Sequence, residues 1–167
     1  ARVDIHDHAG VITLLVNDGD VHRLLLSWDE VTVNQLTIHI PERQHVDIVE
    51  LGEPNQVDVT YHLAKHSSVH YVRASLHKVQ STRYTFHLSE GARLIAGLAD
   101  FAHGKKKEQV TFHLNGREAY ATWRLSSFAD QQDDKVYDVS FIHHAPSTYA
   151  SMANYGVVAD TSKLVFA

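Results

Sequence analysis

The sequence predicts an all-β protein, and three observations lead to this fold class. Apolar residues occupy alternate positions in several short segments, a period of two that is typical of strands with one buried face. Clusters of Gly, Pro, Ser, Asn and Asp interrupt these segments at intervals of roughly a dozen residues, as in all-β folds. No stretch combines the 3.6-residue apolar period of an amphipathic helix with a capping residue.

The expected strands are distributed along the whole chain. Turn residues between them lie at 52–55, 67–68, 89–91 and 103–105. The best helical candidate is a single turn within 148–154. The alternating apolar residues that define the strands are Val31 and Val33; Val46 and Ile48; Val57, Val59, Tyr61 and Leu63; Tyr84, Phe86 and Leu88; and Tyr137, Val139 and Phe141.

An antiparallel hairpin is expected near the N-terminus. Asp18 and Gly19 can both adopt the positive φ angles that a tight two-residue turn requires, and the apolar segments 11–16 and 21–26 flank it. Strands at this spacing are typical of an antiparallel β-sandwich or barrel, but a solenoid of short strands has the same spacing. No motif of fixed length repeats, so the pattern alone leaves both architectures open.

Length and composition indicate a single domain spanning residues 1–167. Of the 167 residues, 44% are hydrophobic and 21% are charged, which is enough to bury one sizeable core. The formal net charge of -5 is spread along the length, so neither nucleic acid nor a membrane surface is an expected partner. The longest basic run, 105–107, is interpreted as a solvated turn.

The sequence also indicates the cellular setting. There is no cysteine, which excludes disulfides and thiolate metal sites and fits a cytoplasmic location. The chain contains neither a signal peptide nor an apolar run long enough to cross a bilayer. It begins without methionine and ends on 164–167 in the middle of a strand pattern, which predicts a fragment truncated at both ends.

The chain has 14 histidines, and this number raises the hypothesis of a metal site. His6 and His8 would share one face of a strand, and His143 and His144 are adjacent. A third ligand from a neighbouring strand would complete a zinc or iron site, which gives a His-based, cupin-like metalloenzyme as an alternative function. Five other histidines occupy the polar positions of alternating strands and are interpreted as surface residues: His39, His62, His70, His87 and His113.

No other arrangement of residues predicts catalysis. There is no Gly-rich phosphate loop, no GxSxG elbow and no HExxH motif. Asp133 and Asp134 are interpreted as solvated loop residues, because consecutive residues of a strand point to opposite faces. We therefore expect a protein that is not an enzyme and has no catalytic residues. A β-sandwich binding module is a further alternative, although Trp28 and Trp123 form no visible platform in the sequence.

The C-terminal third contains an ordered set of residues with a specific spacing: 116–119, 131–132, Asp138, 144–151, 156–157, Asp160, Ser162 and 165–166. This set resembles the core of the SufB/SufD family, the scaffold proteins of SUF iron-sulfur cluster assembly. In that family a strand ending in His precedes a turn with Pro or Gly, and Ser-x-x-Val-Phe follows a Lys-Gly-Val-like strand. Tyr155 departs from the family, which usually has lysine before this glycine. The absence of cysteine favours SufD over SufB.

The resemblance implies a flattened right-handed parallel β-helix in which Asn115 and Gly116 form a corner. It also implies a non-catalytic scaffold that acts with a SufB-like partner and a SufC-like ATPase, while the full-length complex handles the iron-sulfur cluster. The family residues that handle iron or clusters lie beyond Phe166, so no cofactor is expected in this fragment. The open edge of a truncated solenoid is expected to drive self-association.

The family-motif residues are interpreted as structural, because such residues fix turns and permit close packing of coils. None of them is expected to bind a metal or a cofactor. They are Gly116, His144, Pro146, Thr148, Ser151, Gly156 and Phe166.

Overall fold

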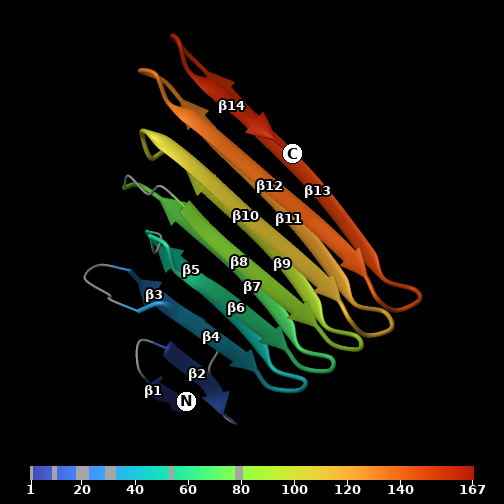
Figure 1. The fold of residues 1–167 in the computed structure, drawn as a ribbon. Helices are drawn as coiled ribbons and strands as arrows, with labels where there is room; N and C mark the ends of the chain where they lie inside the picture. The colour runs from blue at the N-terminus through green and yellow to red at the C-terminus, as the bar shows by residue number, and fades with distance from the viewer. Residues whose placement is uncertain (1, 9–10, 18–22, 29–32, 53–54, 78–80) are drawn as a thin grey trace.

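The computed structural model describes residues 2–8, 11–17, 23–28, 33–52, 55–77 and 81–167, with side chains from Arg23 onward (Figure 1). Its regular elements are all β-strands, which wind into a flattened solenoid of two facing sheets. In this described part of the chain, no helix is long and apolar enough to cross a membrane.

From β3 onward, successive strands alternate between the two sheets, so each coil gives one strand to each sheet. Sheet A has the order β1 (Arg2–His8), β2 (Val11–Asn17), β4 (Gln35–Ile40), β6 (Asp58–Leu63), β8 (Ser81–Leu88), β10 (Lys105–Leu114), β12 (Asp134–His143) and β14 (Lys163–Phe166). Sheet B has the order β13 (Tyr149–Val158), β11 (Tyr120–Ala129), β9 (Arg93–Asp100), β7 (Ser68–Ser75), β5 (His45–Leu51) and β3 (Arg23–Ser27).

The strand pairing confirms the parallel β-helix. Among the described residues, every pair of neighbouring strands is parallel except β1 and β2. Parallel pairing requires a crossover between paired strands, and here the crossover is the strand of the opposite sheet. The antiparallel β-sandwich, the alternative fold, is therefore excluded.

An N-terminal hairpin is present, but it joins different strands from those predicted. β2 pairs with β1, where Val11 lies opposite His8, whereas β3 belongs to sheet B and pairs with β5. The predicted pairing of 11–16 with 21–26 is therefore wrong, and the turn at 18–19 lies outside the described residues. Two apolar segments in one sheet cannot cover each other, whereas segments in facing sheets bury their apolar faces against one another.

The predicted helical turn within 148–154 is also wrong. This segment belongs to β13, whose residues are aligned one by one with β11, from Tyr120 beside Tyr149 to Ala129 beside Val158. The backbone groups that a helix would satisfy internally are satisfied here by the preceding coil.

Each described crossing from sheet A to sheet B, from β4–β5 onward, is a tight corner with one residue in the left-handed region. Corner N–H groups donate to carbonyls of the next coil, as His66 does to Glu90 at 2.9 Å. Asn115 and Gly116 lie in one of these corners, between β10 and β11, as the resemblance implied. The left-handed residues are Arg43, His66, Gly91, Glu118 and Ser147, with φ of 58°, 57°, 64°, 62° and 59°.

Equivalent residues of successive coils lie directly beside one another. Thr37, Thr60, Thr85, Thr111 and Ser140 are register partners in turn along sheet A. The interval between these partners grows from 23 to 29 residues as the coils lengthen toward the C-terminus (Figure 1). This growth is the reason why no repeat of fixed length is visible in the sequence.

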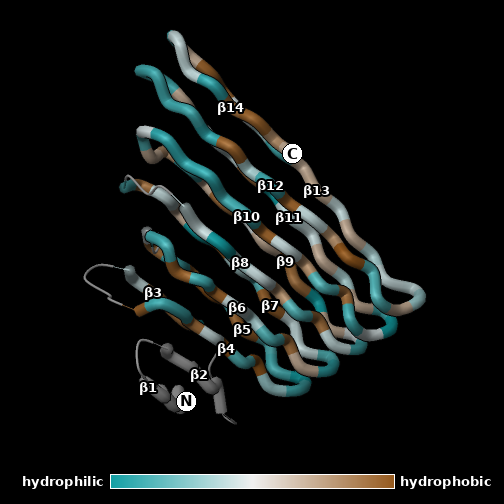
Figure 2. Tube along the Cα trace, viewed as in Figure 1, coloured by the Kyte–Doolittle hydropathy of each residue, from teal (hydrophilic) through white to brown (hydrophobic). Residues whose placement is uncertain are grey.

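The inward side chains form stacked columns between the sheets. Figure 2 shows hydrophobic and hydrophilic residues alternating along the strands, as the period-two pattern predicted. In one inward column, Phe86 stacks on Tyr61 and on Phe112 with ring centroids 5.0 Å apart, and Phe112 stacks on Phe141 at 4.6 Å. These rings fill the part of the core near the corners that lead from sheet A to sheet B.

A group of charged side chains is buried at the opposite end of the coils. Asp100 of β9 lies 2.7 Å from Lys106 Nζ and 3.2 Å from Lys135 Nζ, and it accepts a hydrogen bond from Tyr137. Glu108 pairs with Lys106 at 3.2 Å and with Arg73. Three acids and three bases, each at most 5% exposed, make up this buried charge cluster: Glu50, Asp100, Glu108, Arg73, Lys106 and Lys135.

Two sequence interpretations are corrected by this cluster. The run 105–107 is not a solvated turn, because it begins β10 and points Lys106 into the core. Asp133 is buried as well, and its carboxylate accepts the N–H groups of Gly104 at 2.6 Å and Asp130 at 3.0 Å. Both charges are tolerated inside because each has ionic or hydrogen-bonding partners in neighbouring coils.

The partners also set the protonation of the buried groups. Burial tends to raise the pKa of Asp100, but Lys106, Tyr137 and Lys135 outweigh it and hold this pKa below its usual value. Burial, followed by the charge of Glu50, raises the pKa of Tyr61 and of Tyr84. Both hydroxyls therefore stay protonated and donate to Glu50, Tyr84 at 2.6 Å.

We predict that Asp100→Asn lowers the free energy of unfolding by about 3–5 kcal/mol, because it leaves Lys135 buried without its carboxylate. The measurement is urea denaturation of both proteins under the same conditions. Glu90→Gln is the matched control, since it removes the exposed 3.5 Å pair with Lys65 and should cost less than about 1 kcal/mol. Equal effects of the two substitutions would contradict the importance of the buried charges.

Candidate functional site

The family-motif residues all lie on the last coils, in corners and on strands. Gly116 and Pro146 are in successive corners, and His144 directly follows β12. Ser151 is half-buried on β13 beside Thr122 of β11. Phe166 is on β14, with its ring 5.8 Å from that of Tyr137. The structure places them on consecutive coils rather than around one point.

Gly116 is required by the close stacking of two corners. A Cβ on this residue would overlap the backbone of Ser89 and Glu90 in the preceding corner. Its N–H donates to the carbonyl of Leu88 at 3.2 Å. Backbone atoms cannot move aside as a flexible side chain can, so this glycine has a structural role.

The next corner is held by its own side chains. The hydroxyl of Thr148 donates to the Ala145 carbonyl at 3.2 Å, and its oxygen lies 2.6 Å from Nδ1 of His143. Pro146 is exposed and precedes Ser147, the left-handed residue of this corner. These contacts fix the turn.

Gly156 lies in an open apolar groove on the outer side of sheet B. The groove has a volume of about 600 Å³ and is lined by residues of β11 and β13 together with Phe101. Phe101, Tyr155 and Val157 are 53%, 65% and 61% exposed. Beside the groove, a Cβ on Gly156 would meet the side chain of Leu164. Exposed apolar side chains gathered in a groove are typical of a protein-binding surface.

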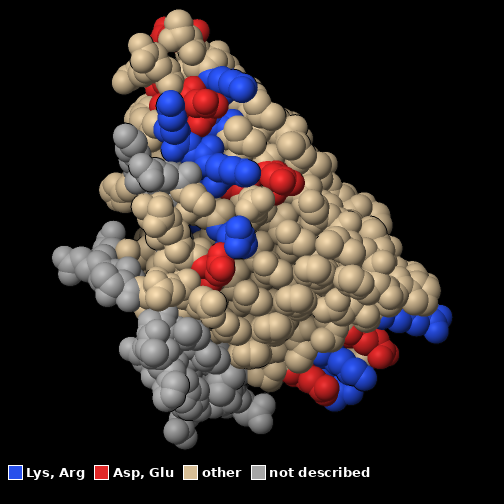
Figure 3. Space-filling model, viewed as in Figure 1, with Lys and Arg blue, Asp and Glu red and all other residues tan. Residues whose placement is uncertain are grey.

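A second candidate for a functional surface, besides the groove, is a column of five stacked imidazoles on the outer face of sheet A. His39, His62, His87, His113 and His144 follow one another with ring centroids 4.8, 4.9, 4.7 and 5.3 Å apart. Successive planes are within 14° of parallel. Figure 3 shows charged side chains gathered near the ends of the coils and a broad uncharged area between them.

Four of the five stacked histidines have lowered pKa values. Partial burial lowers the pKa of His39, His62 and His113. Burial, followed by repulsion from the charged forms of neighbouring histidines, lowers the pKa of His87 to about 4. The middle of the column is therefore neutral at physiological pH, as closely stacked rings require.

The column does not form the metal site that the histidine content suggested. A metal ion needs ring nitrogens that converge at about 2.0–2.1 Å, whereas the nitrogen lone pairs of parallel rings point along parallel planes. His143 contacts Thr148 and His144 stacks on His113, so the adjacent pair does not share a ligand position. The side chains of His6 and His8 lie outside the described residues.

His70, one of the five histidines interpreted as surface residues, is not part of the column and forms a group with His45 and Asp47. His70 lies on the outer face of sheet B, beside Asp47 of β5, with 3.4 Å between Nδ1 and Oδ1. His45, two residues before Asp47, is 3.6 Å from the same oxygen. A second group joins His103 to Asp130 and Asp133 at 3.0 and 3.2 Å.

The sequence contains a signal for the histidine column that was not recognised. The motif Thr-x-His occurs at residues 37–39, 60–62, 85–87 and 111–113. It is hidden from a search for fixed periods because the coils differ in length. The two groups of His and Asp, by contrast, are completed across different strands or turns: the spacing of His45 and Asp47 places both on one side of a strand, but it gives no signal for His70.

Comparison of this chain with family models, with curated proteins and with solved structures yields no match. The geometry of the chain is therefore the basis for assigning its functional site.

We predict that Gly116→Ala destabilises the protein by more than about 1 kcal/mol, because the new methyl group must displace a neighbouring backbone. Gly97→Ala is the control: its Cβ would lie 3.6 Å from the nearest atom, the Arg124 carbonyl oxygen, which is an ordinary contact. Thermal unfolding of the two variants provides the measurement. The close-packing argument fails if the two substitutions have the same effect.

The neutral histidine column predicts a dependence of stability on pH. The pKa of His87 is about 4 in the fold and 6.5 in its ordinary, unfolded state. Between these values the unfolded chain therefore binds more protons than the folded chain. Stability should therefore be complete above pH 6.5 and fall as the pH is lowered toward 4. His87→Gln should weaken this fall, as followed by urea denaturation from pH 7 to 5.

The titration of His87 can also be followed directly by NMR. A ring that protonates near the usual histidine pKa of about 6.5 would contradict the stacked arrangement.

Proposed function

We propose that this chain is the core of a non-catalytic, SufD-like scaffold component of SUF iron-sulfur cluster assembly. The ordered resemblance of residues 116–166 supports this proposal most strongly. The parallel β-helix is the fold that the resemblance implied, and Gly116 and Thr148 have the structural roles expected of motif residues. In this proposal the complex is cytoplasmic, and the full-length assembly handles the cluster.

A scaffold needs a surface on which partners can dock, and the C-terminal coils offer one. The apolar groove beside Gly156 presents Phe101, Tyr155 and Val157 to a partner. We assign this surface to the SufB-like partner and, in its absence, to self-association. ATP hydrolysis belongs to the SufC-like partner.

The cupin-like metalloenzyme has less support. Such an enzyme needs three histidines, or histidines with a carboxylate, converging in a sheltered pocket. Both groups of metal-ligating side chains in the described part of the chain include exposed histidines, and neither group contains three histidines.

The proposal predicts a stable complex when the full-length gene product is expressed with SufB-like and SufC-like proteins from the same genome. The measurements are the stoichiometry of the purified complex and its iron-sulfur content after reconstitution. A protein that purifies without either partner would overturn the proposal.

Substitutions in the groove test whether it is the docking surface. Val157→Lys should reduce recovery of the SufB-like partner by at least about tenfold, since a charge in a docking surface is costly. Leu25→Lys is the matched control, because Leu25 is 66% exposed on β3, at the other end of sheet B. Equal loss with both variants would show that the groove is not the docking surface.

A further inference from the structure

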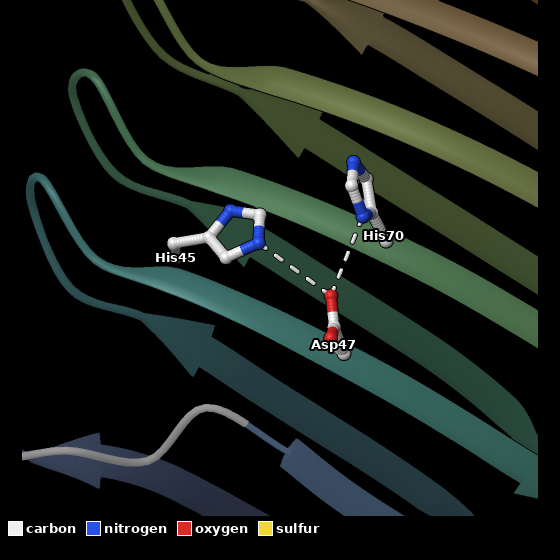
Figure 4. A group of neighbouring side chains, drawn as sticks. All are labelled: His45, Asp47 and His70. Carbon is white, nitrogen blue, oxygen red and sulfur yellow. Dashed lines mark ion pairs between the residues drawn. The ribbon is translucent and has the colours of Figure 1, made fainter.

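Three potential metal ligands converge on the outer face of sheet B (Figure 4). His45 and Asp47 are two residues apart on β5 and therefore share one side of the strand. His70 on β7 is the register partner of Asp47. Nε2 of His45, Oδ1 of Asp47 and Nδ1 of His70 all lie within 4.8 Å of one another.

The separations of the ligand atoms fit a metal ion better than a hydrogen bond. Oδ1 of Asp47 is 3.6 Å from His45 Nε2 and 3.4 Å from His70 Nδ1. A tetrahedral ion with bonds of about 2.0–2.1 Å separates its ligands by about 3.3–3.4 Å. Both imidazoles therefore stand near the positions that a shared ion would give them.

The carboxylate of Asp47 has one oxygen atom, Oδ1, without a hydrogen-bond donor in the described part of the chain. Oδ1 is buried, yet it accepts no hydrogen bond from the described residues. A buried acceptor without a donor is costly, and such atoms point to an unseen ion or water. Both imidazoles face this oxygen, so the position they enclose is suited to a cation.

The second group of this kind has one histidine instead of two, and one of its carboxylates is held by backbone N–H groups, although Oδ1 of Asp130 is also buried without a hydrogen-bond donor among the described residues. Asp133 accepts the N–H groups of Gly104 and Asp130 in addition to its contact with His103. Its two oxygens thus hold adjacent turns together. This group therefore serves as an internal comparison for the group on sheet B.

We propose that His45, Asp47 and His70 bind one divalent first-row transition-metal ion, with the remaining coordination position open to water. Two imidazoles and a carboxylate are ligands that suit zinc and its neighbours in the series, and they disfavour calcium and magnesium, which prefer oxygen. The site lies on two central strands of sheet B, so the ligands are carried by rigid backbone. This inference is independent of the scaffold function.

Titration calorimetry of the untagged chain with Zn²⁺ tests the site. We expect one strongly bound ion per chain, and Co²⁺ in its place should give the visible absorption of a four-coordinate ion. Asp47→Asn and His70→Ala should each weaken Zn²⁺ binding by at least about 100-fold, since even outer-shell partners change metal affinity by about 10–100-fold.

His103→Ala is the matched control and should leave Zn²⁺ binding unchanged. Circular dichroism confirms that each variant keeps its strands, which is expected because His45, Asp47 and His70 are at least partly exposed. Strong binding that survives Asp47→Asn, or that is lost in His103→Ala, would overturn the proposal. So would the absence of a strong site in the unmodified chain.

Discussion

The whole structure depends on in-register stacking of parallel coils. Each residue lies beside its equivalent in the next coil, at the spacing of about 4.8 Å between paired strands. Neutral side chains tolerate such a neighbour well, and the columns of threonine, histidine and phenylalanine use this arrangement. Like charges are accepted only beside a counter-ion: Lys106 and Lys135 are register partners and both contact Asp100. In one outward column Asp58 lies beside Arg83, 3.6 Å away. In the histidine column, burial followed by repulsion between neighbouring rings lowers the pKa of His87.

Inside the solenoid, two different cores occupy the two ends of each coil. Stacked aromatic rings fill one end and contribute apolar burial, which is insensitive to exact partners. The buried charge cluster fills the other end, where each charge needs a partner from another coil. A slip of one residue would turn every inward charge to the outside. The cluster therefore penalises wrong registers more than it adds to stability, since burying charges has a large desolvation cost.

The functional surfaces follow from the same geometry. A parallel solenoid is rigid along its length, so groups on different coils keep fixed relative positions. The groove near Gly156 gathers side chains from β11, β13 and Phe101, while His45 and Asp47 of β5 meet His70 of β7. In both places residues of different coils are adjacent only because the coils are stacked. A partner surface and a metal site can therefore coexist on one sheet without sharing residues.

The sequence by itself determined which side of each strand is buried. The alternation at Val57, Val59 and Tyr61 leaves one apolar face, and that face must be covered whatever the fold. It also placed turns such as 89–91 and 103–105, because Gly and Ser are typical turn residues, although most left-handed corner residues, such as Arg43 and Glu118, are of other types. The parallel fold and the corner at Gly116 were obtained from the resemblance, because alternation is the same in a sandwich and in a solenoid.

Only the tertiary structure decided which residues meet. The sequence could not show that Lys106 is buried, because a lysine is stable inside only beside a carboxylate such as Asp100, which belongs to another strand. Its inward position was implied by the alternation that continues from Val110 through Glu108, but burial of charge depends on the partner. The groups around Asp47 and Asp133 were hidden for the same reason. Pairing across coils depends on coil length, and coil length varies along this chain.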